Sequence, residues 1–574
     1  MSHPELADDD ARRIGLAEAW IAQDPDPETR DELAAIIEGV RTGDPSAAAD
    51  LADRFDARLA FGTAGLRGAI AAGPNRMNRV LVSQAAAGLA AYVLEHAEPG
   101  ETPSIVIGYD GRKNSDVFAR DSAEVIAGAG VRAILLPRLL PTPVLAFAVR
   151  HLGTSAGIMV TASHNPPNDN GYKVYLGGEH HGSQIVSPAD AEIAAHILRV
   201  ADSSAVPDLP RGTFETAPES VVDAYVEQTA AVAAAPASPD AQPVVVYTAM
   251  HGVGWETMAK VLDRAGFRTP ALVDAQISPD AAFPTVSFPN PEEPGAMDLS
   301  FARAAESGAD LVIANDPDAD RLAIAIPDAS ADAGWRRLSG NEVGLLLGWQ
   351  VAEQAAAAAA GDGGPEGSLA CSIVSSPGLE AVARAYGLEF EATLTGFKWI
   401  SRAPGLRFGF EEALGYLVNP ETVRDKDGIS AGVAFLSLAA RLHAEGRTVA
   451  DHLDAFVERF GCFASGQVSI RVTDLARIGA VMSALRANPP SHVGDVRVDR
   501  IEDLADGFGA LPPSDVLRIV LADGSRVMVR PSGTEPKLKV YIDAVSEQGT
   551  VAERRAAANA SVAAIEAAMR ELVA

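Results

Sequence analysis

The sequence predicts an α/β fold divided among several domains, and three observations lead to this prediction. The chain has 574 residues, which is more than one hydrophobic core can organise. Short apolar runs alternate with segments of helical periodicity, an order typical of mostly parallel sheets. Two stretches of biased composition, residues 231–243 and 361–365, interrupt this alternation and indicate domain boundaries.

A helical lead precedes the first domain. Residues 8–56 place apolar side chains at helical spacing among acidic and basic ones, so we expect residues 1–56 to pack as helices on the first domain. That domain is expected over residues 57–240. Its predicted helices are 80–96 and 116–129, and its predicted strands are 104–109, 131–136 and 156–160.

Three further blocks follow. A second domain, 241–362, is expected to contain strands 310–315 and 322–326 and a helix that starts at Gly340. A third, 363–463, begins with strand 368–374. The fourth, 464–574, is shorter and less helical and is expected to end in a helix near residues 548–573. In each block a strand leads into a loop of polar and charged residues.

Composition excludes several classes of protein. The formal net charge is −30, which argues against nucleic acid or an anionic membrane as a partner. No apolar run has spanning length, and the acidic start of the chain does not resemble a signal peptide. Only two cysteines occur, Cys371 and Cys462, which favours a reducing compartment. We therefore expect a cytoplasmic protein that binds neither nucleic acid nor membranes.

The most informative segment is Thr161-Ala-Ser-His-Asn-Pro-Pro-Asn-Asp-Asn-Gly-Tyr-Lys173, directly after the strand 156–160. Its two prolines stiffen the loop, so Ser163 is held at the carboxyl end of a strand, where open α/β sheets bind ligands. His164 and Lys173 place an imidazole and an ammonium nearby. An ordinary turn is the alternative, because Asn-Pro and Asp-Asn-Gly are common turn formers.

A second segment, Asp316-Pro-Asp-Ala-Asp-Arg321, predicts a metal site. The carboxylates of Asp316, Asp318 and Asp320 can meet at one hard cation. A calcium EF-hand is excluded because Arg321 stands where its loop needs glycine and Pro327 where it needs a bidentate glutamate. A solvated acidic turn is disfavoured, since apolar strands flank the loop and three anions repel one another strongly without a cation.

Five other segments carry residues suited to anions or hydroxyl groups. Glycines flank Arg67 in one loop, and a charged turn contains Lys426. Carboxylates suit sugar hydroxyls, because each can accept two donors, and cations with small residues suit phosphate. Plain loops, a surface rim and an exposed charged turn are the alternatives. The candidates are Arg67, Lys398, Glu411, Glu412, Lys426, Arg530, Ser532, Gly533, Thr534 and Lys537.

These segments together resemble the α-D-phosphohexomutase superfamily, which contains phosphoglucomutases and phosphomannomutases. The resemblance implies three similar αβα-sandwich domains and a smaller α+β C-terminal domain around a central cleft. It also implies that Ser163 carries a phosphoryl group and, with Asp316, Asp318 and Asp320, binds Mg²⁺. Arg67 would face the phosphoserine, and Lys173, Arg67 and His164 would be the catalytic side chains beside it.

The same resemblance assigns the remaining candidates to the substrate. Lys398, Glu411 and Glu412 would orient the sugar, with Arg321 and Lys426 as further contacts. Arg530, Ser532, Gly533, Thr534 and Lys537 would hold the unreactive phosphate. Ala413 departs from the family, because many members have a serine there, and this departure bears on which sugar is bound.

The expected reaction is the interconversion of hexose 1-phosphate and hexose 6-phosphate, glucose first and mannose next. It would pass through a sugar bisphosphate, with glucose 1,6-bisphosphate as activator, in a monomer or dimer. The lead, the Gly-Phe-Lys-Trp segment and the Glu-Glu-Ala-Leu-Gly-Tyr segment also resemble a branch that contains phosphopentomutases, so ribose 1-phosphate is the main rival substrate. A metal-dependent sugar phosphatase and a non-catalytic sugar-phosphate sensor are the alternatives from other classes.

Overall fold

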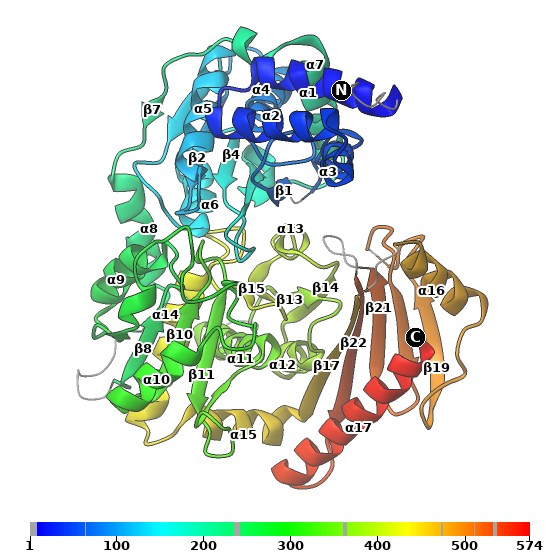
Figure 1. The fold of residues 1–574 in the computed structure, drawn as a ribbon. Helices are drawn as coiled ribbons and strands as arrows, with labels where there is room; N and C mark the ends of the chain where they lie inside the picture. Colours follow the sequence, from blue (N-terminus) through cyan, green and yellow to red (C-terminus); the bar gives the residue numbers. More distant parts are fainter. Residues whose placement is uncertain are drawn as a thin grey trace. The chain divides into compact units, whose positions relative to one another are not determined.

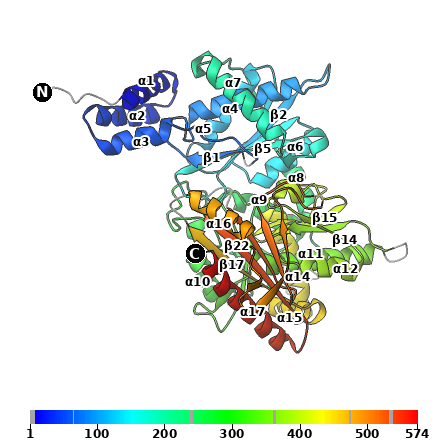
Figure 2. The same cartoon turned by 90° about the vertical axis from the view of Figure 1, so that its right-hand side faces the viewer.

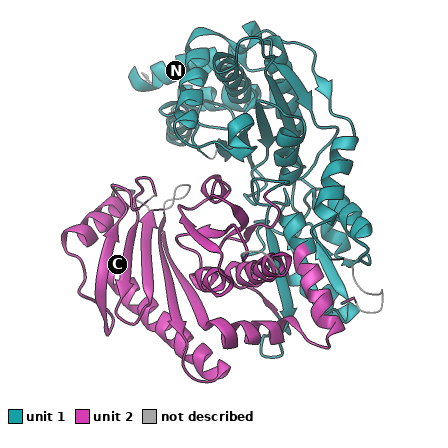
Figure 3. Cartoon of the chain, turned by 180° about the vertical axis from the view of Figure 1, so that it is seen from behind, with its two compact units in different colours: residues 1–235, 243–335, 421–433 teal, residues 236–242, 336–420, 434–574 magenta. Residues whose placement is uncertain are grey.

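The structure is a computed structural model that describes residues 8–63, 65–234, 242–359, 364–471, 475–509, 511–531 and 537–573. The chain divides into two compact units (Figure 3). Unit 1 contains residues 1–235, 243–335 and 421–433, and unit 2 contains residues 236–242, 336–420 and 434–574. Among the described residues, no helix combines the length and the apolar character needed to cross a membrane.

Unit 1 begins with the expected helical lead, which forms three helices: α1 (Asp8–Gln23), α2 (Pro27–Arg41) and α3 (Pro45–Phe55). The side chains of Asp26 and Asp44 cap α2 and α3, and each of these helices has proline in its first turn, where a missing N–H costs nothing. Apolar side chains of the three helices share a core with Ala72, Val80 and Val206 of the following domain. The lead therefore packs on the first domain, as Figures 1 and 2 show.

The first sheet of unit 1 has the strand order β1-β5-β4-β2-β3-β7, with β6 paired to β5. Its strands are β1 (Leu66–Ala69), β2 (Ser104–Tyr109), β3 (Arg132–Leu135), β4 (Ala156–Val160), β5 (Asp169–Leu176), β6 (Ser183–Gln184) and β7 (Glu215–Thr216). The accompanying helices are α4 (Arg79–Glu95), α5 (Ser115–Gly128), α6 (Thr142–His151), α7 (Ala189–Ser203) and α8 (Ser220–Ala230).

The second sheet of unit 1 has the order β12-β11-β10-β8-β9. It comprises β8 (Val245–Thr248), β9 (Ala271–Leu272), β10 (Leu311–Asn315), β11 (Leu322–Pro327) and β12 (Trp335–Arg337), with helices α9 (Gly254–Ala265) and α10 (Asp298–Ser307). Strands β10 and β11 form an antiparallel hairpin, whereas β10 and β8 are parallel. The loop between β10 and β11 is the acidic segment 316–321.

Unit 2 contains a third sheet, ordered β14-β13-β15-β16, and a fourth, ordered β17-β22-β21-β20-β19-β18. The third sheet and its helices comprise α11 (Gly340–Ala358), β13 (Ser368–Ser372), α12 (Gly378–Tyr386), β14 (Glu389–Thr393), α13 (Phe397–Ile400), β15 (Leu406–Glu411), β16 (Gly415–Leu417) and α15 (Val449–Phe460); α14 (Gly428–Ala444) starts in unit 1 and ends in unit 2. The fourth sheet and its helices comprise β17 (Cys462–Arg471), α16 (Leu475–Ala487), β18 (His492–Val493), β19 (Val496–Asp503), β20 (Leu517–Leu521), β21 (Arg526–Pro531), β22 (Lys537–Ser546) and α17 (Val551–Leu572).

The α/β class is confirmed, with one correction to the sheets. Each of the first three sheets has a parallel centre but continues into antiparallel strands, as in the pairs β4–β5, β10–β11 and β15–β16. We predicted mostly parallel sheets from the alternation of strands and helices along the chain. Instead the chain turns straight back as a neighbouring strand, so each loop is the turn of a hairpin. The fourth sheet is antiparallel throughout its paired strands.

Candidate active site

Ser163 lies in the turn between β4 and β5 and is only 2 % exposed. Its φ angle is +53°, a left-handed conformation that a residue with a Cβ adopts only under constraint. The Ser163 amide donates to Thr161 Oγ1 at 2.9 Å, and its Oγ donates to Asp316 Oδ2 at 2.9 Å. The hydroxyl that the sequence singled out therefore faces the predicted metal loop.

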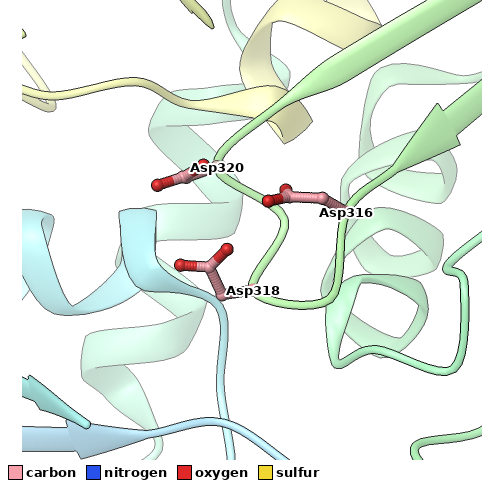
Figure 4. Close-up of side chains that lie close together, drawn as sticks. All are labelled: Asp316, Asp318 and Asp320. Carbon is pink, nitrogen blue, oxygen red and sulfur yellow. The ribbon is translucent and has the colours of Figure 1, made fainter. Parts of the chain in front are cut away.

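The three aspartates converge at the end of the β10–β11 hairpin (Figure 4). Asp316 and Asp318 are fully buried and Asp320 is 1 % exposed. One oxygen from each lies within 4.8 Å of those from the others. A hydrogen bond within the loop fixes Asp316, because the Arg321 amide donates to Asp316 Oδ1 at 3.0 Å. Ala319 has a left-handed backbone conformation, with a φ of +54°.

The contacts of these carboxylates fit a divalent cation. Oδ1 of Asp318 and Oδ1 of Asp320 are buried and have no hydrogen-bond partner among the described residues. A buried anionic oxygen without a partner carries a large desolvation penalty. Carboxylate oxygens are also the ligands that Mg²⁺ prefers. The residues present therefore suit Mg²⁺, with Asp316, Asp318 and Asp320 as its protein ligands.

Lys173 neutralises part of this charge. Its Nζ lies 2.8 Å from Asp318 Oδ2 and 2.7 Å from Asp320 Oδ2, and the side chain is 6 % exposed. Burial lowers the pKa of Lys173, but the two carboxylates outweigh burial and raise the pKa above its ordinary value. Lys173 belongs to β5, opposite Met159 of β4, so the hairpin that presents Ser163 also delivers this ammonium.

The pKa values of Asp316 and Asp320 are shifted in opposite directions. Burial, reinforced by Asp318 and Asp320, raises the pKa of Asp316 well above its ordinary value. Burial also acts to raise the pKa of Asp320, yet Lys173, Lys426 and Arg321 together hold that pKa below its ordinary value. Neighbouring like charges thus favour the protonated form of Asp316, and neighbouring cations favour the ionised form of Asp320.

His164 and Arg67 are also in the site. The His164 Nδ1 lies 3.1 Å from Ser163 Oγ. Burial, with further contributions from Arg321 and Arg67, lowers the pKa of His164 well below its ordinary value, so the imidazole is neutral at pH 7. Arg67, on β1, donates to Asn165 Oδ1 at 3.3 Å. Burial lowers the pKa of Arg67 as well.

Lys426 is drawn into the same site rather than exposed in a charged turn. Its Nζ lies 3.3 Å from Asp320 Oδ2, and its side chain is 12 % exposed. The neighbouring Asp425 is buried and accepts hydrogen bonds from Tyr175 at 2.8 Å and Gln184 at 3.1 Å. These two contacts anchor the segment that presents Lys426. The alternative of an exposed charged turn is therefore wrong for this residue.

The remaining candidates that the structure describes lie in unit 2. Glu412 Oε2 accepts hydrogen bonds from Ser375 Oγ at 2.9 Å and Ser372 Oγ at 3.2 Å. Arg530, on β21, donates to Thr395 Oγ1 at 2.7 Å, and Thr395 precedes Lys398 on α13. Glu411 ends β15, and Lys537 begins β22. Ser532, Gly533 and Thr534 lie outside the described residues.

Sequence reasoning missed two of the residues that support the site, Thr142 and Ser375. Thr142 Oγ1 donates to Asp318 Oδ2 at 2.5 Å from the start of α6, and nothing in the sequence around Thr142 marks this role. Arg112, by contrast, was signalled by the segment Asp110-Gly-Arg112, which ends the predicted strand 104–109 with a glycine and an arginine and was expected to help shape the site; it contacts the Ser163 loop. Ser375 had no signal, because a serine in a loop is ordinary.

Comparison with known proteins identifies the family. Four family models match consecutive parts of the chain: phosphoglucomutase/phosphomannomutase alpha/beta/alpha domain I over residues 58–203, domain II over 223–329, domain III over 339–460 and the C-terminal domain over 468–561. The chain therefore belongs to the phosphoglucomutase/phosphomannomutase family.

Relatives support the same class. A Haemophilus influenzae protein named "Probable phosphomannomutase" is 54% identical over 83% of this chain and 95% of its own. A Mus musculus phosphopentomutase is 34% identical over 94% of this chain and 91% of its own, and a Staphylococcus aureus phosphoglucomutase is 34% identical over 85% and 90%. The expected class, a phosphosugar mutase and hence an isomerase, is confirmed.

A solved structure supports the fold. The phosphoglucomutase/phosphomannomutase family protein of Burkholderia thailandensis has a TM-score of 0.67 and 20% identity, and the match covers 90% of this chain and 97% of that one. The expected four-domain arrangement of three αβα domains and a smaller C-terminal domain is confirmed by the four family models and this match.

Proposed function

We propose that this protein interconverts hexose 1-phosphate and hexose 6-phosphate through a phosphoserine at Ser163 and a sugar bisphosphate. The observation that carries the proposal is the buried contact of 2.9 Å between Ser163 Oγ and Asp316 Oδ2, beside two carboxylate oxygens without hydrogen-bond partners. A nucleophilic oxygen next to a cation site is the arrangement that phosphoryl transfer requires.

The chemical cycle has two balanced halves. In the first, a sugar hydroxyl attacks the phosphorus on Ser163, the bond from phosphorus to Ser163 Oγ breaks, and the hydroxyl proton passes to a side chain of the site. In the second, Ser163 Oγ attacks the other phosphate of the bisphosphate, and the proton returns to the departing sugar oxygen. The protein's contribution is position and charge compensation more than covalent chemistry.

Individual residues have separate tasks in this cycle. Lys173, Arg67 and His164 hold or exchange the proton of the sugar oxygen. Arg321 and Lys426 add positive charge beside the transferring group. Mg²⁺ held by Asp316, Asp318 and Asp320 would draw charge from the phosphoryl group.

The residues of unit 2 are proposed to bind the rest of the substrate. Glu411, Glu412 and Lys398 would take the sugar hydroxyls, and Arg530 with Lys537 would take the unreactive phosphate. Ser532, Gly533 and Thr534 are proposed for the same phosphate. Glucose is the first substrate to test and mannose is the second. The 54% identical relative named "Probable phosphomannomutase" supports the test of mannose.

Ribose 1-phosphate remains the main rival of the hexose phosphates as substrate. Relatives named phosphopentomutase cover 94% of this chain, and Ala413 stands where many members of the family have serine. Purified protein should therefore be given glucose, mannose and ribose 1-phosphates in parallel, each with and without glucose 1,6-bisphosphate. We expect the highest kcat/KM for a hexose; a pentose preference would overturn the choice of sugar but not the class of reaction.

Ser163→Ala tests the phosphoserine itself. Because the variant lacks the accepting oxygen, we expect intact-protein mass to show no added phosphoryl group after bisphosphate treatment, and mutase activity to be lost. Steady release of inorganic phosphate by the wild type would favour a phosphatase, and no reaction with any of the three sugars would favour a sensor. A Ser163→Ala protein with normal turnover would refute the proposal.

A further inference from the structure

Arg112 is buried and uses both terminal nitrogens of its guanidinium group on the backbone of the Ser163 loop. Nη1 donates to the carbonyl of Pro166 at 2.9 Å and to that of Asp169 at 3.2 Å. Nη2 donates to the carbonyls of Ser163 and Asn165. The side chain is 1 % exposed. Four carbonyls of one loop therefore converge on a single side chain.

The fifth N–H of Arg112, on Nε, faces Asp110 but makes no hydrogen bond among the described residues. Its Nε lies 3.3 Å from Asp110 Oδ2, and arginine has five N–H donors in all. The ring of Phe283 covers the guanidinium, with 5.0 Å between its centroid and the arginine Cζ. All four N–H groups of Nη1 and Nη2 are used on the loop rather than offered to a phosphate or a sugar, which separates the role of Arg112 from that of Arg67.

Asp110 completes the arrangement from the other side of Ser163. Its Oδ2 accepts from Thr161 Oγ1 at 2.7 Å, and Thr161 Oγ1 in turn accepts from the Ser163 amide at 2.9 Å. Its Oδ1 accepts from Ser115 Oγ at 2.7 Å and from the Arg112 amide at 3.1 Å. The amide and the carbonyl of Ser163 are thus both tied, directly or through Thr161, to the Asp110–Arg112 pair.

We call the contacts of Asp110, Arg112 and Thr161 with the Ser163 loop the bracket; they stabilise a loop that has a strained residue and few backbone donors of its own. Ser163 has a φ of +53°, which costs about 1–2 kcal/mol for a residue with a Cβ. Pro166 and Pro167 supply no N–H, so the buried carbonyls around them need donors from elsewhere. Without Arg112 the loop would lose the contacts that fix its left-handed turn.

We propose that Asp110 and Arg112 are positioning residues that hold the direction of Ser163 Oγ constant while it gains and loses a phosphoryl group. The proposal rests on the function proposed above. A phosphoryl group changes the charge on this oxygen by about two units, and a misplacement of about 1 Å can cost about 100-fold in rate. A loop fixed by neutral carbonyls and a buried ion pair keeps its place through that change.

Arg112→Lys tests the bracket. Lysine keeps the charge beside Asp110 but has three donors on one atom, so it cannot satisfy four carbonyls. We expect kcat to fall about 10- to 100-fold, KM to stay within about two-fold, and phosphorylation of Ser163 by glucose 1,6-bisphosphate to slow to the same extent. The rate of phosphorylation is read by intact-protein mass.

Arg79→Lys is the matched control. Arg79 also forms a paired contact with a buried aspartate of unit 1, at 2.6 Å and 2.9 Å to the two oxygens of Asp121, but it does not contact the Ser163 loop. We expect a similar loss of melting temperature and unchanged kcat. Equal kcat in Arg112→Lys and the wild type would overturn the proposal, as would a rise in KM alone, which would make Arg112 a substrate contact.

Thr161→Val tests the other side of the bracket if Arg112→Lys does not fold. It removes the hydroxyl between the Ser163 amide and Asp110 with little change in volume, and we expect kcat to fall with KM unchanged; a normal kcat would overturn the proposal. Failure of the proposed function has a different signature, because the wild type would then show neither isomerisation nor phosphorylation of Ser163.

Discussion

The hydroxyl of Ser163 and the carboxylate of Asp316 meet at 2.9 Å although 153 residues separate them in the chain. Each was recognisable alone, Ser163 by its proline-stiffened loop and Asp316 by the alternating aspartates. Arg112 and Thr142 support the two loops from outside both segments, and no local pattern connects them with either one. At this scale the sequence identifies the reacting groups, and long-range hydrogen bonds decide their geometry.

Asp318→Asn should lower the affinity of the site for a cation while Asp316 and Asp320 remain as ligands. The amide keeps the size of the side chain but replaces one anionic oxygen, and Lys173 loses one of its two carboxylate partners. We expect Mg²⁺ affinity to fall at least about 10-fold, since even indirect partners of metal ligands cost about 10- to 100-fold. Isothermal titration with Mg²⁺ measures this, with exposed Asp263→Asn on α9 as control. Unchanged affinity would contradict the assignment.

At the scale of elements, the loop after β8 supports the metal loop. The Val253 amide donates to the Pro317 carbonyl at 2.9 Å, and a Cβ added to Gly252 would lie 2.3 Å from the Pro317 Cα. Only a residue without a side chain allows this approach. Glycine at position 252 is therefore a condition for the position of Asp316 and Asp318 on either side of Pro317.

Gly252→Ala tests this support. Since the Pro317 backbone must move, we expect a loss of roughly 1–3 kcal/mol in the free energy of unfolding, together with weaker Mg²⁺ binding. Chemical denaturation and Mg²⁺ titration measure the two effects. Gly15→Ala on α1, where an added Cβ meets nothing within 4 Å, should instead gain about 0.5–1 kcal/mol. Equal behaviour of the two variants would disprove the support.

The packing of α15 on α11 predicts a pH dependence of stability. His452 stacks on Trp349, with 4.3 Å between ring centroids and 8° between planes. Burial, aided by Arg441, lowers the pKa of His452 from 6.5 to about 4. The unfolded chain therefore binds the proton first as pH falls, so this contribution to stability is complete above pH 6.5 and is lost between pH 6.5 and about 4.

His452→Gln should remove that dependence. As pH is lowered through this window, we expect the free energy of unfolding to decrease more steeply for the wild type than for the variant. The difference in slope corresponds to the uptake of up to about one additional proton on unfolding. Denaturation at a series of pH values measures the two slopes. Parallel slopes would mean that His452 titrates alike in the folded and unfolded chains.

At the scale of the whole molecule, the sequence predicted the class and order of the elements better than the pairing of strands. Strand β4 was predicted at its observed bounds, because five apolar residues end at a clear loop signal. Strand β5 was missed, because Asp169-Asn-Gly171 signals a turn and only the pairing with β1 and β4 makes it extended. The sequence also did not predict that Tyr175 and Gln184 hold the segment that carries Lys426. Both donate hydrogen bonds to Asp425, from which each is separated by more than 200 residues.

The net charge of −30 predicts how the molecule responds to salt. Self-repulsion among surface carboxylates opposes the compact state, and salt screens it. We expect the melting temperature to rise when sodium chloride is increased from about 10 mM to about 150 mM, with choline chloride acting alike. A rise with sodium alone would indicate a bound ion instead, and a fall would contradict net repulsion.

The three carboxylates proposed to bind the cation come from a single segment of six residues, 316–321, whereas Ser163 comes from another hairpin, 153 residues away from Asp316 in the chain. If these proposals hold, binding of the metal and competence for catalysis are separable properties of this chain. A substitution that displaces the Ser163 hairpin, such as one in the Asp110–Arg112 pair, would then leave a protein that binds the ion but does not transfer the phosphoryl group.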